Sequence, residues 1–512
     1  MTGISRWIDR HAEFVPQKPA ILFEGEVVTY ADFARRVRDA ARTLRNVYGV
    51  KPGDRVAFLG LGLPDVFYLL FACARLGAMF LPLNWRLAGP EHHFILEDSG
   101  ARILIADADH RARAEELHAA LPDMALVACD FEAQGEAQGE ASGWPNLWLD
   151  CEGAEGDDAN PEGGSDAPVL LVYTSGTTGR PKGAVLTQEA ILINALNAIH
   201  ANHMTETDHI LNALPLFHVG GLNVQSTPAI YSGATITLHR RFVPADVLKA
   251  LQHEGITLAV LVPAMQQGVM AEPGWNAAQF PDLRFVMSGS TTVPRPLIEA
   301  MHAKGVPVGQ VYGSTETGPV AVYLRAEDAL AKAGSTGRAG LHCDMRIVDE
   351  DGRDMPEGEA GEILIRGGNL LAEYWRNEEA TRAALKDGWY FTGDVGYVDA
   401  DGFLWVHDRK KDVIISGGEN IYPAEVEMII HAMVDIADGV VVGKADAKWG
   451  EVPIAVVELK AGAEADAAEF LDRFEGKIAK FKRPKDVRFI EALPRNAMGK
   501  VLKHEVRAMI AE

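Results

Sequence analysis

The chain has 512 residues, which is too long for a single hydrophobic core and predicts at least two domains. Its hydrophobic content of 47% and charged content of 24% are typical of a globular enzyme that dissolves in water. The net charge of −23 argues against nucleic acid as the main partner, because a duplex-binding protein needs a basic face that displaces counterions.

The N-terminal part of the chain predicts neither export nor a membrane span. Residues 1–10 contain no apolar signal core, and the most apolar region, residues 56–83, is interrupted by Asp65 and Arg75. We interpret that region as a strand followed by a buried helix. The cysteines lack metal-ligand spacing and are too few for a disulfide framework, so we expect reduced thiols and a cytoplasmic protein. They are Cys73, Cys129, Cys151 and Cys343.

The first 400 or so residues alternate β-rich runs with helical stretches. The β-rich runs include 55–59, 102–106, 257–262 and 283–287, and the helical stretches include 65–76 and 243–253. This alternation predicts a layered α/β architecture with largely parallel sheets.

Residues 132–167 interrupt this pattern. They are rich in Gly, Glu, Asp, Ala and Pro and show no hydrophobic periodicity. We expect an exposed connection with weak structure here, and not a domain boundary.

A run of glycines and hydroxyl residues closed by a lysine occupies residues 173–183, with the sequence Tyr-Thr-Ser-Gly-Thr-Thr-Gly-Arg-Pro-Lys-Gly. Glycines allow backbone N–H groups to surround anionic oxygens, hydroxyls donate hydrogen bonds, and Lys182 offsets negative charge. The loop therefore suits a polyphosphate ligand. It is not a Walker A loop, because that pattern would require Gly at Pro181 and Ser or Thr at Gly183. Taken alone, the segment is also compatible with a structural turn after a strand.

Beyond residue 343 the pattern changes twice. Residues 343–407 contain short strands with turns between them and predict a small β-rich subdomain. The charged segment 408–412 joins two apolar runs and is a candidate hinge. The apolar runs that follow, together with an amphipathic stretch at 465–481, fit an α+β module of about 100 residues.

Several sequence motifs occur in order along the chain. They are the loop at 173–183, Leu-Phe-His at 216–218 with Gly-Gly at 220–221, Tyr-Gly-Ser-Thr-Glu-Thr-Gly at 312–318, Thr-Gly-Asp at 392–394, Asp-Arg-Lys-Lys-Asp at 408–412, Ser-Gly-Gly-Glu-Asn-Ile-Tyr-Pro at 416–423 and Pro-Arg-Asn-Ala-Met-Gly-Lys at 494–500. With these motifs nearly the whole chain resembles the adenylate-forming superfamily, which includes acyl-CoA synthetases, aryl-CoA ligases, beetle luciferases and peptide-synthetase adenylation domains.

The resemblance implies an α/β fold in which a large domain is hinged to a small one. The N-terminal domain, residues 1–408, would hold the ATP and acyl sites in layered α/β subdomains and the small β-rich subdomain. The C-terminal domain, residues 409–512, would be a mobile α+β module.

The resemblance also implies two half-reactions that use ATP, Mg²⁺ and coenzyme A. A carboxylate attacks the α-phosphate of ATP to give an acyl-adenylate and pyrophosphate, and the CoA thiol then attacks the acyl carbon. The enzyme must neutralise phosphate charge, align the reacting groups and exclude water. Local positive charge is available at Lys182, Arg409, Lys410 and Lys411, whereas residues 477–485 form either a CoA phosphate contact or a solvated helix face.

Most of the nucleotide site follows from the resemblance. Thr315 and Glu316 would contact the α-phosphate and ligate magnesium, with Glu316 as the metal ligand. Tyr312 would stack on the adenine, Gln310 would bond its exocyclic amine, and Asp394 would accept from the ribose hydroxyls. The expected ATP-binding residues are Thr174, Ser175, Gly176, Thr177, Thr178, Gly179, Lys182, Gln310, Tyr312, Gly313, Thr315, Asp394 and Arg409.

His218 lies in an apolar segment, where a lone histidine is usually a packed core residue. The resemblance implies instead that it borders the acyl pocket and moves between the two steps. Small residues near it would leave room for an acyl chain or ring, and no arginine for a second carboxylate is evident. The expected pocket residues are His218, Gly220, Gly221, Asn223, Ser288, Gly289, Val311 and Gly318.

Lys500 matches the family's adenylation lysine and completes the expected catalytic set with His218 and Glu316. Its ammonium would bridge the attacking carboxylate and the α-phosphate. Because Lys500 belongs to the small domain, domain closure must bring it to the nucleotide, and a swivel would then expose the CoA tunnel. Lys411 matches the pivot position. The expected tunnel loop is Ser416, Gly417, Gly418 and Glu419.

We interpret the chain as an AMP-forming carboxylic acid:CoA ligase for a medium- or long-chain fatty acid. The alternatives are a hydroxycinnamate or other aryl-acid ligase and a catalytically silent nucleotide-binding paralogue. An amino-acid adenylation domain is disfavoured, because no aspartate occurs near Phe217 and His218 to pair with a substrate ammonium. The expected partners are the three small molecules. Homodimer formation and modification of Lys500 by a lysine acetyltransferase are further expectations.

Overall fold

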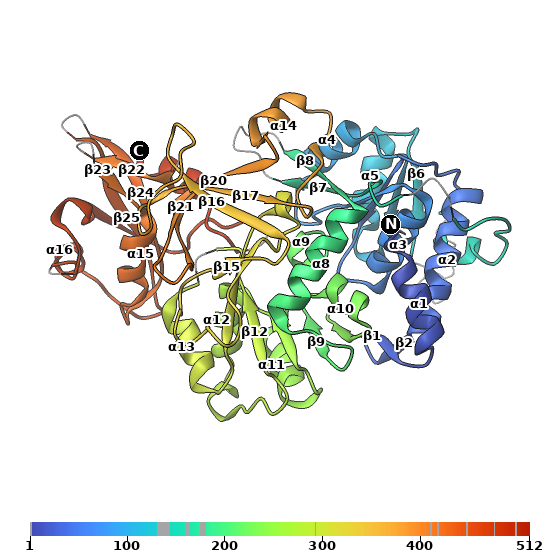
Figure 1. The fold of residues 1–512 in the computed structure, drawn as a ribbon, viewed down its shortest axis with the longest axis horizontal. Coiled ribbons are helices and arrows are strands. Elements are labelled where there is room, and N and C mark those ends of the chain that lie inside the picture. The colour runs from blue at the N-terminus through green and yellow to red at the C-terminus, as the bar shows by residue number, and fades with distance from the viewer. Residues whose placement is uncertain are drawn as a thin grey trace.

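The computed structural model describes residues 3–130, 144–159, 164–174, 181–291, 293–409, 412–416, 419–446, 449–475, 477–496 and 499–511. Large β-sheets with helices packed on them form most of the molecule, and a small α+β module lies at one end of it (Figure 1). The N-terminal helices α1 (Arg6–Phe14), α2 (Tyr30–Asn46) and α3 (Pro64–Leu76) lie at the opposite end. The model therefore has the large and small domains that the sequence predicts.

The first sheet has the strand order β15-β14-β13-β12-β11-β9-β10-β1-β2. Its strands are β1 (Pro19–Phe23), β2 (Glu26–Thr29), β9 (His209–Asn212), β10 (Thr235–Leu238), β11 (Leu258–Val260), β12 (Phe285–Ser288), β13 (Val308–Tyr312), β14 (Val322–Tyr323) and β15 (Arg338–Ala339). The pairs from β1–β10 through to β12–β13 are parallel, which confirms the predicted sheet type. The register places Ser288 beside Gln310.

The second sheet has the strand order β18-β8-β7-β4-β3-β5-β6. Its strands are β3 (Arg55–Leu59), β4 (Met79–Pro82), β5 (Ile103–Ala106), β6 (Ala125–Ala128), β7 (Pro168–Thr174), β8 (Lys182–Thr187) and β18 (Glu373–Tyr374). Between β3 and β4 runs α3, which begins at Pro64 and is capped by Gly77 in the left-handed conformation. Nearly all of its side chains are buried, which confirms the predicted strand and buried helix.

Helices fill the space between these sheets. α8 (Gln188–Asn202) packs on β8, and α10 (Ser226–Ser232) packs on α8 and on β9 and β10.

The other α-helices in the described residues lie elsewhere in the two domains. They are α4 (Gly89–Ser99), α5 (Arg111–Ala120), α7 (Leu147–Asp150), α9 (Val219–Asn223), α11 (Pro244–His253), α12 (Pro263–Met270), α13 (Arg295–Ala303), α14 (Glu378–Ala384), α15 (Pro423–His431), α16 (Ala467–Asp472) and α17 (Lys503–Ala511). In the described part of the chain, no helix is long and apolar enough to span a bilayer.

A small sheet and the C-terminal module follow. The small sheet consists of β16 (Cys343–Val348), β17 (Gly361–Gly367), β19 (Leu385–Lys386), β20 (Trp389–Val398) and β21 (Leu404–Arg409), as predicted for residues 343–407. The module's sheet consists of β22 (Ile414–Ser416), β23 (Glu419–Ile421), β24 (Ile436–Asp446), β25 (Gly450–Leu459) and β26 (Asp486–Ile490). The expected domain boundary at 408/409 falls at the end of β21, on which α15 packs.

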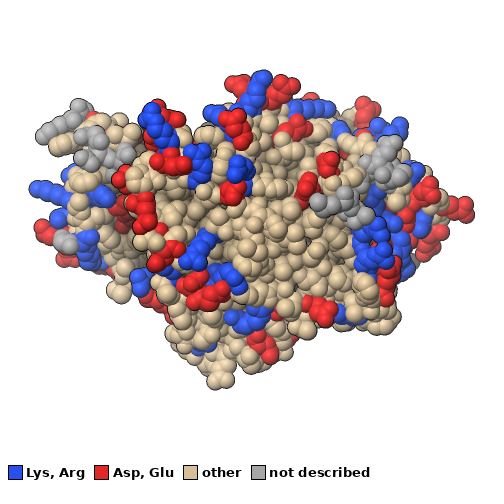
Figure 2. Space-filling model, viewed as in Figure 1, with Lys and Arg blue, Asp and Glu red and all other residues tan. Residues whose placement is uncertain are grey.

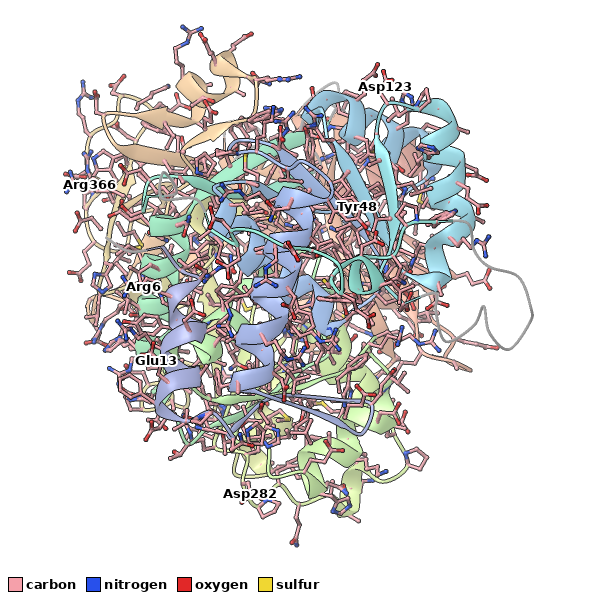
Figure 3. All side chains as sticks on the ribbon, turned by 90° about the vertical axis from the view of Figure 1, so that its right-hand side faces the viewer. Arg6, Glu13, Tyr48, Asp123, Asp282 and Arg366 are labelled. Carbon is pink, nitrogen blue, oxygen red and sulfur yellow. The ribbon has the colours of Figure 1, made fainter. Side chains whose placement is uncertain are left out.

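Within the exposed, weakly structured connection predicted for 132–167, residues 146–150 differ, whereas residues 151–159 and 164–167 form turns and irregular segments that are exposed or half-buried, as predicted. The side chain of Leu147 in α7 is fully buried, and the indole N–H of Trp148 donates to Asp65 (2.7 Å). Tyr48, labelled in Figure 3, donates to Asp150 (2.6 Å) and fastens α7 beside α2. A few apolar anchors order this segment although its composition is polar. Residues 131–143 and 160–163 lie outside the described residues.

Charged side chains of both signs are interspersed over the face of the molecule shown in Figure 2. The net charge of −23 therefore does not form one continuous acidic surface on this face. Small anionic ligands can approach such a surface through local basic groups.

Candidate functional site

A lysine, a tyrosine and a carboxylate from distant segments meet where the second sheet contacts the 3₁₀ turn Thr315–Thr317. The Tyr374 hydroxyl donates to Oε1 of Glu316 (2.7 Å), and Nζ of Lys182 lies 5.5 Å from the centroid of the Tyr374 ring. Burial and the Glu316 charge raise the pKa of Tyr374, so the phenol remains a donor. A buried carboxylate is thus held close to a cation through one aromatic side chain.

The end of β13 contacts the small sheet through a second tyrosine. The Tyr312 hydroxyl donates to Oδ2 of Asp394 (2.9 Å), and the Thr392 hydroxyl accepts the backbone N–H of Asp394 (3.0 Å). Burial and the Asp394 charge raise the pKa of Tyr312. On the same strand Gln310 is buried, and its Nε2 has no hydrogen-bond partner within the described structure. An unpaired buried amide is expected where a ligand with ring nitrogens and an amine binds.

The turn after β13 requires glycine at position 313. A Cβ at Gly313 would lie 1.8 Å from the carbonyl oxygen of Pro319, so no side chain fits there. Thr315 and Glu316, which follow, are both buried. The close approach of the backbone fixes the turn that presents these two residues.

His218 caps α9 through its own ring. Its Nδ1 accepts the backbone N–H of Gly220 (2.9 Å), so the proton of the neutral imidazole is on Nε2. Burial lowers the pKa of His218 to about 4, although the charge of Glu316 acts in the opposite direction. The imidazole is therefore neutral at physiological pH and lies within the electrostatic reach of Glu316.

Gly221 in α9 has a structural reason to be small besides the predicted one. A Cβ at Gly221 would lie 2.4 Å from the carbonyl oxygen of Pro215, so the missing side chain allows the backbone to approach closely. Asn223 is fully buried and donates to the carbonyl of Gly318 (2.9 Å). This bond ties α9 to the turn that contains Glu316.

The ends of β12 and β13 are packed in a similar way. The Ser288 hydroxyl accepts from Gln266 and donates to the carbonyl of Leu261, both at 2.9 Å. A Cβ at Gly289 would lie 2.7 Å from the carbonyl oxygen of Val311, so glycine permits close contact of the two strand ends. The Ser288 hydroxyl thus joins the end of β12 to α12 and to Leu261, and Gly289 allows the end of β13 to approach closely.

Lys500 lies in a tight loop that contacts the large domain. The side-chain oxygen of Asn496 accepts the backbone N–H of Lys500 (2.9 Å), and the Lys500 carbonyl accepts the N–H of Asn496 (2.8 Å). Gly499 has a φ of +77°, and a Cβ there would lie 3.2 Å from the Cβ of Ala264 in α12. The loop before Lys500 therefore lies against α12 of the large domain.

Some expected site residues lie outside the described residues. They are Ser175, Gly176, Thr177, Thr178, Gly179, Lys411, Gly417 and Gly418. Arg409 and Glu419 lie on β21 and β23, with only their backbone described. Thr174 and Lys182 form the last described pair of the β7–β8 ladder, on either side of the phosphate loop. Ser416 is buried and pairs with Gly450.

Tyr374 and Tyr390 are the residues at this site that sequence reasoning missed. Burial and the Glu316 charge raise the pKa of Tyr390 as well, so Tyr390 lies within the electrostatic reach of the same carboxylate. Neither tyrosine belongs to a motif with fixed local spacing, and Tyr374 is 58 residues from Glu316. Only the pairing of β18 with β8 brings Tyr374 to the site.

Comparison with known families agrees with this geometry. The model of the AMP-binding enzyme family matches residues 8–375, and that of the AMP-binding enzyme C-terminal domain matches residues 425–500. The chain belongs to this family. The resemblance to adenylate-forming enzymes and the expected α/β fold are thereby confirmed.

Relatives extend over the full length of the chain. The indoleacetate–CoA ligase of Aromatoleum aromaticum is 48% identical over 99% of this chain and 98% of its own. A feruloyl-CoA synthase of an Amycolatopsis species is 39% identical over 99% and 98% of the two chains. The O-succinylbenzoate coenzyme A synthetase of Bacillus subtilis, solved with ATP and magnesium, is 32% identical with a TM-score of 0.85 and covers 99% of both chains.

The family member described here is an AMP-forming acid–thiol ligase whose substrates include ATP and coenzyme A, with magnesium as the metal. Among the residues the structure describes, no three His, Cys, Asp or Glu side chains gather into a metal site made by protein alone. A magnesium ion that binds with a nucleotide needs only one or two carboxylates, and the buried Glu316 fits that need. When bound, magnesium would neutralise phosphate charge.

Replacing Tyr374 with Phe removes the donated hydrogen bond to Glu316 and keeps the ring beside Lys182. A hydrogen bond to a charged group contributes about 1.5–3 kcal/mol, so we expect adenylate formation to slow roughly 10- to 100-fold. Carboxylate-dependent pyrophosphate release measures this rate.

Tyr48→Phe is the matched control, because Tyr48 also donates to a carboxylate, that of Asp150 (2.6 Å), away from the site. We expect Tyr48→Phe to leave pyrophosphate release within about twofold of the unsubstituted enzyme. Equal rates for the two variants would contradict a role of Tyr374 in holding Glu316.

NMR titration of the His218 ring, assigned by comparison with His218→Gln, should give a midpoint near the value of about 4 that burial produces. Because this folded-state pKa is below the unfolded value of about 6.5, stability from neutral His218 is complete above pH 6.5 and is lost as pH falls toward 4. A midpoint at or above 6.5 would show that the ring is solvated or stably ion-paired.

Proposed function

We propose that this AMP-forming ligase acts on an aromatic carboxylic acid of the arylacetate type, with indoleacetate as the first candidate. The observation that carries the proposal is the 48% identity to an indoleacetate–CoA ligase over 99% of the chain. The 39% identity to a feruloyl-CoA synthase also favours an aromatic acid. The fatty acid expected from the sequence is the competing substrate, and the experiment below includes it.

Within this proposal the described residues divide the binding of ATP among them. Lys182 offsets phosphate charge, and Glu316 ligates magnesium beside the hydroxyl of Thr315. Tyr312, fixed by its bond to Asp394, presents its ring to the adenine. Asp394 is proposed to accept from the ribose hydroxyls.

Lys500 is proposed to bridge the acid carboxylate and the α-phosphate in the first step. Two anions at reacting distance repel each other, and a cation between them lowers that cost most in a site from which water is excluded. Neutral His218 adds no positive charge at the acyl side, which suits a substrate whose only charge is one carboxylate. The pivot at Lys411, the tunnel loop and acetylation of Lys500 remain predictions.

The substrate is tested by measuring kcat/KM for indoleacetate, phenylacetate, ferulate and benzoate beside straight-chain acids of graded length. Both pyrophosphate release and CoA thioester formation are followed. We expect an arylacetate to exceed every straight-chain acid by at least roughly 10-fold, which corresponds to about 1.4 kcal/mol of transition-state binding. A straight-chain acid with the highest kcat/KM would overturn the proposal.

Lys500→Ala tests the catalytic assignment separately from the substrate. We expect adenylate formation to fall by roughly 100- to 1,000-fold, because the positioned cation is lost, while CoA transfer from synthetic acyl-AMP is largely retained. Equal loss in both half-reactions would contradict the assignment.

A further inference from the structure

The loop that carries Lys500 is held by the guanidinium of Arg495, which belongs to the same loop. We call Pro494–Asn496 together with Gly499–Leu502 the lysine loop. Arg495 and Val501 form a β-bridge across it, and the backbone N–H of Leu502 donates to the carbonyl of Pro494 (2.8 Å). Nη1 of Arg495 donates to the carbonyl of Gly499 (2.8 Å), directly before Lys500. The Arg495 side chain therefore links the beginning of the lysine loop to the residue before Lys500.

The other side of the same guanidinium binds a carboxylate of the module's sheet. Nη2 of Arg495 donates to Oδ2 of Asp438, at the start of β24. The second oxygen of Asp438 accepts from Nε2 of His431 (2.8 Å) at the end of α15 and from the N–H of Gly439 (2.7 Å). The fork geometry of arginine permits simultaneous bonds to the loop and to the carboxylate.

The carboxylate of Asp438 in this network is ionised at neutral pH. Burial opposes ionisation of Asp438, but the hydrogen bonds and charges of His431 and Arg495 lower its pKa to about 2. The bond and charge of Asp438, with a contribution from Glu427, raise the pKa of His431 against the effect of burial. Glu427, whose charge acts on His431, forms an ion pair with Lys503 (3.0 Å).

The module contains an ion pair of the same type that does not contact the lysine loop. Arg473 binds Asp435 through both carboxylate oxygens (2.6 and 2.8 Å). The side chains of this pair are 33% and 19% exposed, compared with 32% and 18% for Arg495 and Asp438. The two ion pairs therefore match in chemistry and in side-chain exposure. Within the described residues, they differ in that only Arg495 also bonds the lysine loop and only Asp438 also accepts from a histidine.

We propose that Asp438 and His431 are positioning residues for the adenylation half-reaction, because they orient Arg495 and through it the backbone next to Lys500. The proposal rests on the proposed role of Lys500. None of the three side chains would contact ATP or the acid. Their contribution is to hold the lysine loop in the shape in which Gly499 contacts Ala264 of the large domain.

The half-reactions separate this role from general stability. In Asp438→Asn the loop should lose its anchor, and since a misplacement of about 1 Å costs on the order of 100-fold, kcat for adenylation should fall roughly 10- to 100-fold. KM for ATP and for the acid should stay within about threefold. CoA transfer from synthetic acyl-AMP should stay within about threefold as well, because that step does not use Lys500.

Asp435→Asn is the matched control and should leave both half-reactions within about twofold, with a similar decrease in melting temperature. Arg495→Lys is the second variant in case Asp438→Asn does not fold. It keeps a cation for Asp438 but not the fork, and should show the same selective loss of adenylation. Asp438→Glu, which keeps the charge, should recover part of the adenylation rate.

Unchanged adenylation in folded Asp438→Asn, equal loss of both half-reactions, or the same selective loss in Asp435→Asn would each overturn the proposal. Lys500→Ala, measured in parallel, separates the catalytic role of Lys500 from the positioning role of Asp438 and His431. If Lys500→Ala loses adenylation selectively and Asp438→Asn does not, only the positioning role fails. If Lys500→Ala loses no adenylation, the proposed function of Lys500 fails.

Discussion

The reaction of this ligase requires two anions, a carboxylate and a phosphate, to approach to bonding distance, and the structure is organised around that repulsion. The described charged groups proposed for the nucleotide, Lys182, Glu316 and Asp394, belong to the large domain, whereas Lys500 belongs to the small one. Gly499, the residue before Lys500, lies against Ala264 of the large domain. Under the proposed role of Lys500, its place on a separate module would allow the cation to leave after the first step, when the thiol must enter.

Within the large domain, neutral tyrosine hydroxyls donate hydrogen bonds to the carboxylates of the site. Tyrosine hydroxyls bind both Glu316 and Asp394, and burial raises the pKa of each phenol, so these donors do not ionise. His218 is neutral for the complementary reason, since burial disfavours its charged form. These neutral groups hold the carboxylates by hydrogen bonds and burial without adding positive charge of their own.

Features encoded in short stretches of sequence could be predicted. The strand 55–59 and the helix after it follow from local apolar patterns. Interactions between distant segments could not. Tyr374 reaches Glu316 only through the β8–β18 pairing, α7 is ordered by Leu147 and Trp148 against another helix, and Gly221 is small because a backbone carbonyl approaches it. A sequence pattern shows that a residue is small or polar, but it does not show which distant residue packs against it or bonds to it.

The chemical route itself can be tested with acid labelled with ¹⁸O in its carboxylate. If the carboxylate attacks the α-phosphate, one labelled oxygen remains on that phosphorus when the CoA thiol displaces AMP. Mass spectrometry should then find one ¹⁸O per AMP and none in pyrophosphate. ADP as the nucleotide product, with the label in inorganic phosphate and no labelled AMP, would contradict an acyl-adenylate intermediate and with it the account of how the two domains cooperate.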